Sequence, residues 1–227
     1  MNTKFTIKSI IIVIVCLSSS YTFSETSADR AMLKSIVEID LKSFKRLIAE
    51  GYDVNSFMDH KDKYWLMCEV VRHGRLKLLD HAVKSGGDIN LVRPNTAQSY
   101  SSPLMCAIAY RNKEAFDYLL SLGADPNIEG CPECDAEDQY LPFREALARN
   151  QFQMAYELIG VTKMTELELE TTRFALEDVR YLPRPEESQE EYRIKLAGYL
   201  ESKGYQPNIW TIEKEISGEW IPSRNRK

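Results

Sequence analysis

The sequence lacks the short motifs that usually identify an enzyme. It contains no Gly-x-Ser-x-Gly elbow, no Gly-x4-Gly-Lys phosphate loop, no Gly-x-Gly-x-x-Gly and no His-Glu-x-x-His. Its three histidines, His60, His73 and His81, offer no pair at metal-ligand spacing. Neighbouring acids such as Glu168 and Glu170 are interpreted as solvated charge rather than as an acid–base pair. We therefore predict a protein that is not an enzyme and needs no cofactor.

The sequence also lacks the excess of positive charge that nucleic-acid binding requires. It has 29 Lys and Arg residues against 34 Asp and Glu residues, a net charge of −5. The basic tail at 224–227 is too short a footprint for a polyphosphate chain. Acidic stretches at 129–138 and 186–191 would either steer a basic protein partner to the chain or simply keep its loops soluble. The composition thus predicts no nucleic-acid partner.

Long hydrophobic runs are missing as well. The longest apolar run, residues 10–17, is too short to span about 30 Å of hydrocarbon. It follows two lysines and precedes a short polar stretch, a pattern typical of a signal peptide over 1–24. We therefore expect export, to a bacterial periplasm or, alternatively, by secretion. A lipid anchor at Cys16 is the less favoured variant, because Val15 is bulkier than such processing normally needs.

What the chain does have is a recurring pattern that ends in asparagine. The copies close at Asn55, Asn90, Asn127 and Asn208, with 35 residues between the first two and 37 between the next two. The clearest copy begins with Ser-Pro-Leu at 102–104, where a hydroxyl residue before proline favours the start of a helix. It ends with Gly-Ala-Asp-Pro-Asn at 123–127, where glycine favours the end of a second helix. Between them, the apolar residues of 115–120 have helical spacing.

These residues resemble an ankyrin repeat, whose period is about 33 residues. The resemblance implies an all-α solenoid of about four to five helix-turn-helix repeats with long loops between them, over residues 25–208, followed by a C-terminal tail at 209–227. The other copies are more divergent: Trp65 and Leu66 replace the hydroxyl residue and proline, which weakens the helix cap. The last copy, over 167–208, has a long connection and is either a repeat or a capping helix pair.

The resemblance also implies where a partner would bind. Such solenoids contact other proteins through the loop tips between repeats, here 57–64, 91–101 and 128–140, and through the exposed side of each first helix. Arginine and tyrosine are the residue types that concentrate binding energy. The candidate contact residues are Arg72, His73, Tyr110, Arg111, Arg149, Tyr64 and Tyr100.

The cysteines divide into two pairs. Cys131 and Cys134 lie in a loop insertion, where a small disulfide is the favoured interpretation. A zinc site would need two further ligands, and a thioredoxin-like redox centre would need a strand-to-helix setting. Cys68 and Cys106 fall within the first helices of adjacent repeats and are predicted to be buried thiols in the core.

An exported chain of this kind is similar to small periplasmic ankyrin-repeat proteins, some of which neutralise a toxin delivered by neighbouring cells. The leading hypothesis is therefore an immunity-type inhibitor that binds and blocks a toxic effector enzyme. One alternative is a periplasmic scaffold or helper of an envelope or oxidative-stress enzyme. Another is a secreted factor that binds a host protein.

Overall fold

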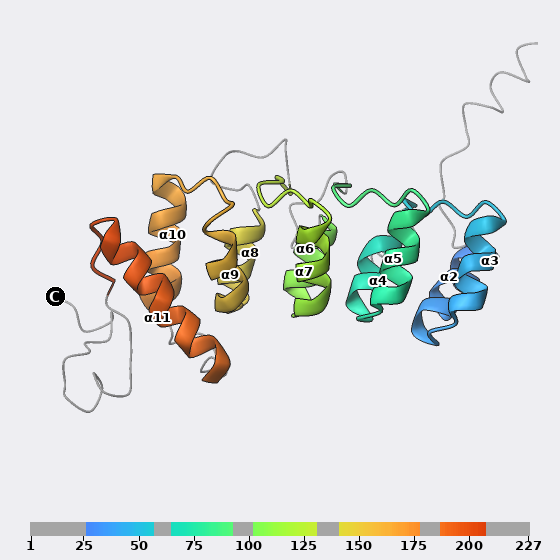
Figure 1. Cartoon of the computed structure of the whole chain (residues 1–227), viewed down its shortest axis with the longest axis horizontal. Helices are drawn as coiled ribbons and strands as arrows, with labels where there is room; N and C mark the ends of the chain where they lie inside the picture. The colour runs from blue at the N-terminus through green and yellow to red at the C-terminus, as the bar shows by residue number, and fades with distance from the viewer. Residues whose placement is uncertain (1–25, 57–64, 93–101, 131–140, 178–186, 208–227) are drawn as a thin grey trace, which may run out of the picture.

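The computed structural model describes residues 26–56, 65–92, 102–130, 141–177 and 187–207, and all ten elements assigned in these ranges are α-helices. Successive helices pack in pairs that lie side by side in one row (Figure 1). The pairs are α2 (Ser27–Val37) with α3 (Leu41–Ala49), α4 (Leu66–Arg72) with α5 (Leu76–Lys84), α6 (Pro103–Ala109) with α7 (Lys113–Ser121), α8 (Pro142–Ala148) with α9 (Phe152–Leu158), and α10 (Glu166–Glu177) with α11 (Glu187–Ser202). The all-α solenoid is confirmed.

The first helices of the pairs form the centre of one continuous core. In α4 every residue from Leu66 to Val71 is buried, because the helix lies between α2, α6 and its own partner α5. The second helices bury only one stripe each, such as Leu78, Leu79 and Ala82 in α5. This difference explains why the inner first helices α4 and α6 are mostly apolar, whereas the second helices mix apolar and charged residues.

The helix ends follow the expected local signals. The Ser102 hydroxyl accepts a hydrogen bond from the amide of Met105 (3.3 Å), whereas Trp65 provides no side-chain cap for α4. Gly123 has a φ of 88°, in the left-handed region that glycine adopts without strain.

The turn inside each of the first four pairs has the same left-handed conformation, but the residue is not always glycine. The equivalent positions are Ile39, Gly74, Arg111 and Asn150, with φ between 57° and 64°. For a β-branched residue this conformation costs about 1–2 kcal/mol relative to a right-handed one. Ile39 is therefore the strained member of the set.

The recurring asparagines join each repeat to the next. The Asn55 side chain accepts a hydrogen bond from the amide of Asp88 (2.8 Å) and donates one to the carbonyl of Gly86 (3.0 Å). Asn90 accepts the equivalent bond from Asp125 (2.8 Å), while Asn127 accepts one from Lys163 (2.8 Å) and donates one to Val161 (3.1 Å). Asn208 lies outside the described residues. The repeat in the sequence thus reflects a repeated contact between neighbouring loops.

Replacing Asn55 by alanine should remove both bonds to the following repeat. We expect a loss of about 1–2 kcal/mol in the free energy of unfolding, measured by urea denaturation. Asn55→Asp is the matched variant, because it keeps an acceptor for the Asp88 amide but cannot donate to Gly86. Asn55→Asp should lower the free energy of unfolding less than Asn55→Ala does. Equal stability of the native chain and both variants would contradict the bridging role of Asn55.

Candidate functional site

The C-terminal ends of three first helices present one row of polar and aromatic side chains. His73, Tyr110 and Arg149 each follow directly on the last residue of α4, α6 and α8. These helices have equal length and pack side by side, so the three residues occupy equivalent positions. Arg72, the last residue of α4, reaches the next repeat, with its guanidinium 5.5 Å from the ring centroid of Tyr110. We call Arg72, His73, Tyr110 and Arg149 the first-helix row.

Two buried glutamates lie at the base of this row. Glu69 is 3% exposed, and its carboxylate is 3.6 Å from Arg72 Nη1 and 3.6 Å from His73 Nε2. Glu145, 1% exposed, accepts a hydrogen bond from Arg149 Nε at 2.9 Å. The arginines offset part of the cost of burying these charges, and the carboxylates in turn restrict the arginine side chains.

The two glutamates were not among the predicted site residues. The sequence does contain a signal for them, because each glutamate occurs three residues after the first residue of its helix. Each is also four residues before the member of the row that follows the helix, His73 or Arg149. This spacing places an acid and a base on the same helical face.

The site shifts the pKa values of two of its groups. Burial raises the pKa of Glu69, against the opposing effect of the Arg72 charge. Burial lowers the pKa of His73, and the charges of Arg72 and Arg75 act in the same direction. The Glu69 carboxylate would by itself favour the imidazolium, but the net direction for His73 is downward. His73 is therefore neutral at neutral pH.

These directions predict how stability changes with pH. Because His73 has a lower pKa in the folded chain, the unfolded chain binds the proton first, and stability falls as the pH drops below about 6.5. The raised pKa of Glu69 acts oppositely and costs stability as the pH rises above about 4.5. Urea denaturation across this pH range measures both effects. His73→Asn should remove the fall in stability below about pH 6.5, and Glu69→Gln should remove the fall in stability above about pH 4.5. An unchanged pH profile in His73→Asn would contradict the assignment.

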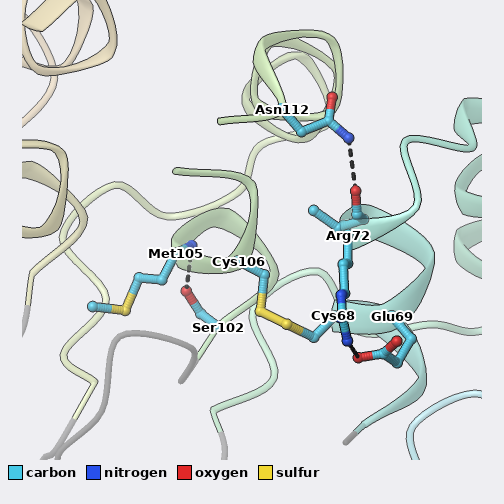
Figure 2. Close-up of a disulfide and its surroundings, with 8 residues drawn as sticks. Cys68, Glu69, Arg72, Ser102, Met105, Cys106 and Asn112 are labelled. Atoms are coloured by element: carbon cyan, nitrogen blue, oxygen red, sulfur yellow. Dashed lines mark hydrogen bonds and ion pairs between the residues drawn. A yellow bond between two sulfur atoms is a disulfide. The ribbon is translucent and has the colours of Figure 1, made fainter. Parts of the chain in front are cut away.

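A disulfide joins α4 to α6 beside the row, and this corrects the prediction of free thiols at Cys68 and Cys106 (Figure 2). Their Cα atoms are 5.5 Å apart and their sequence separation is 38 residues. Their burial was predicted correctly, since Cys68 is 3% exposed and Cys106 is fully buried. Their position in the first helices of adjacent repeats predicted this burial. It did not reveal that the two helices meet in the register that brings the sulfurs together.

An ion pair makes a comparable connection between α8 and α10. Arg144 donates to Glu168 through Nε (3.0 Å) and Nη2 (2.6 Å), and Glu168 is only 2% exposed. Thr165 also donates its amide to the Glu168 carboxylate (3.2 Å). The prediction that Glu168 is a solvated charge was therefore wrong, because this side of α10 faces α8. Glu170 remains 37% exposed and pairs with Arg173 at 2.7 Å.

The other candidate contact residues are placed differently. Arg111 follows Tyr110 in the turn, where it lines a polar pocket of about 270 Å³ with Lys113 and Gln153. It therefore belongs to the edge between α7, α9 and α11, whereas Arg72, His73 and Tyr110 lie together. Four predicted residues lie outside the described ranges: Tyr64, Tyr100, Cys131 and Cys134. The same is true of most of the loop tips.

Within the five described ranges, no cluster of three or more His, Cys, Asp and Glu side chains has the grouping that a metal ion requires. In the same ranges, no helix combines the length and apolar character needed to cross a bilayer. The first-helix row is the candidate partner surface, because it contains four of the seven predicted contact residues.

Comparison with known families identifies one segment of the chain. Residues 99–128 match the family model described as ankyrin repeat. This segment contains α6 and α7, the pair with the most regular sequence, and the other helix pairs stack on it in the same order. Among curated proteins, none matched the chain.

Proposed function

The chain is an ankyrin-repeat solenoid, and from that premise we propose that it is an exported protein-binding module of the immunity type. In this proposal it binds a toxic effector enzyme in the periplasm and blocks it. Ankyrin repeats are protein-interaction modules and are typically not catalytic, which supports a protein as the partner.

The disulfide supports export. Disulfides persist in oxidising compartments such as the periplasm and are rare in the cytosol. The sulfurs of Cys68 and Cys106 lie inside the repeat core, so their bond is part of the folded architecture rather than a surface adduct. This agrees with the proposal that residues 1–24 direct the chain out of the cytoplasm.

The main structural support for protein binding is the arrangement of side chains in the first-helix row. Tyr110 offers a partly exposed aromatic ring against which Arg72 stacks, and arginine and tyrosine are enriched at the energetic centres of interfaces. Glu69 and Glu145 restrict Arg72 and Arg149 before any partner arrives, which reduces the entropy lost on binding. Because the acids are buried and the arginines are partly exposed, the complementary surface of the partner would carry carboxylates.

Co-purification from an envelope extract, followed by a rescue assay, tests the proposed function. We expect a stoichiometric complex with one toxic enzyme, and survival of cells that produce that enzyme together with this chain. Recovery of housekeeping envelope proteins alone would contradict the immunity role and favour a periplasmic scaffold. Binding to a host protein alone would favour a secreted factor.

Truncation of Tyr110 tests the surface itself. Tyr110→Ala should weaken binding of the captured partner by about 2 kcal/mol, roughly 30-fold in Kd, measured by isothermal titration calorimetry. Tyr156→Ala is the matched control, because Tyr156 is 39% exposed on the second helix α9. If the two variants weaken binding equally, or neither does, the first-helix row is not the contact surface.

A further inference from the structure

A second surface lies over the second helices. Two hollows of about 350 Å³ and about 420 Å³ share the lining residues Leu41, Leu76 and Lys77 and together extend over parts of α3, α5 and α7. We call this surface the second-helix groove. None of its lining residues belongs to the first-helix row, so it can act independently of the proposed partner surface.

The lining of the groove is partly apolar. Ile39, Leu41 and Leu76 contribute aliphatic side chains, and Ile39 is 51% exposed. Ile39 is also the β-branched residue in the left-handed turn, at a φ of 60°. Because the Ile39 side chain is half exposed, its burial offsets little of the cost of the left-handed backbone. An isoleucine retained at such a position points to a role at the surface.

The groove also carries cationic groups. Lys45 of α3 and Lys77 of α5 line it, together with Arg75, the residue that precedes α5. Arg75 occupies the position where Asp40 and Asn112 cap their own helices, but its side chain makes no cap. Its Nε is buried and has no hydrogen-bond partner. A buried guanidinium N–H of this kind is unfavourable unless an acceptor reaches it.

The acids of the groove do not neutralise these cations. Asp80 is already engaged, because it accepts hydrogen bonds from the Tyr118 hydroxyl (2.7 Å) and from Lys84 Nζ (2.8 Å). Glu114, on α7, is the other acid in the lining. The groove therefore combines aliphatic contacts with more positive than negative charge available to a ligand.

We propose that the second-helix groove docks an acidic peptide segment of a partner protein that carries leucine or another large apolar residue. The apolar side chain would lie against Ile39, Leu41 and Leu76, and its carboxylates would meet Lys45, Lys77 and Arg75. Apolar anchors give such a segment its affinity, and the charge pattern selects acidic over basic sequences.

Fluorescence anisotropy with the full chain tests this proposal. The probe is a short fluorescein-labelled peptide of leucine and glutamate, and the comparison peptide has lysine in place of every glutamate. We expect saturable binding of the acidic peptide and at least about tenfold weaker binding of the basic one. No saturable binding of the acidic peptide, or equal affinity for both, would overturn the proposal.

Three variants locate the binding. Lys77→Glu should weaken binding of the acidic peptide about tenfold, whereas Tyr110→Ala in the first-helix row should leave it unchanged. Ile39→Gly should raise the denaturation midpoint, because strain is relieved, yet weaken peptide binding through loss of the apolar contact. A purely structural Ile39 would change stability without changing affinity. Unchanged binding in Lys77→Glu would refute the site even if the first-helix row binds its own partner.

Discussion

Loss of the disulfide between α4 and α6 is expected to be the most destabilising change in the chain. The double variant Cys68→Ala, Cys106→Ala should lower the free energy of unfolding by about 4 kcal/mol. The bond spans 38 residues, and closing a loop of this length restricts the unfolded chain by an amount of that order. Alanine is the appropriate replacement, because a serine hydroxyl at these buried positions would add a desolvation cost.

Urea denaturation with and without a thiol reductant provides the measurement. The reductant should lower the midpoint of the native chain much more than that of the double variant, in which Cys131 and Cys134 are the remaining predicted disulfide pair. Cys131→Ser with Cys134→Ser is the control for the other cysteine pair, and it should keep the sensitivity to reductant. If the reductant leaves the denaturation midpoint of the native chain unchanged, the Cys68–Cys106 bond does not contribute to stability as predicted.

Removal of Arg144 should have the second largest effect. Arg144→Ala leaves the Glu168 carboxylate buried without its cationic partner, although Thr165 still donates to it. Breaking a buried ion pair on one side typically costs 3–5 kcal/mol, and we expect about 3 kcal/mol here because the Arg144 side chain is 15% exposed. The measurement is the shift in free energy of unfolding from urea denaturation.

Replacing both partners together distinguishes two quantities. One is the cost of leaving the Glu168 carboxylate buried and unpaired, and the other is the net contribution of the ion pair to the free energy of unfolding. Arg144→Met with Glu168→Leu removes the charges together and keeps apolar volume between α8 and α10. It should recover most of the stability lost in Arg144→Ala, because no uncompensated charge remains. If the joint variant is as unstable as Arg144→Ala, the loss arises from packing rather than from the unpaired carboxylate.

Both predictions concern contacts between adjacent first helices. In a solenoid each repeat buries its faces only against its neighbours, so stability depends on these interfaces as well as on each helix pair. The disulfide strengthens the interface of α4 with α6, and the ion pair strengthens that of α8 with α10. The contact of Arg72 with the Tyr110 ring adds to the interface of α4 with α6 at the surface.

The sequence by itself determined the repeat architecture. The cap at Ser102, the left-handed turn at Gly123 and the apolar stripes of the helices are signals that act over a few residues, so they could be read without knowledge of the fold. The same signals located Arg72, His73 and Tyr110 at the end of the first helices, since position within a repeat follows from its register.

Only the tertiary structure decided which side chains meet across repeats. The sequence placed Cys68 and Cys106 on packed faces but did not pair them, and it assigned Glu168 to solvent although α8 covers it. It also did not show that Ile39, Arg75 and Lys77 share one groove. The physical reason is that periodicity defines the face of a helix, whereas a contact between helices depends on how far and at what angle two faces pack against each other.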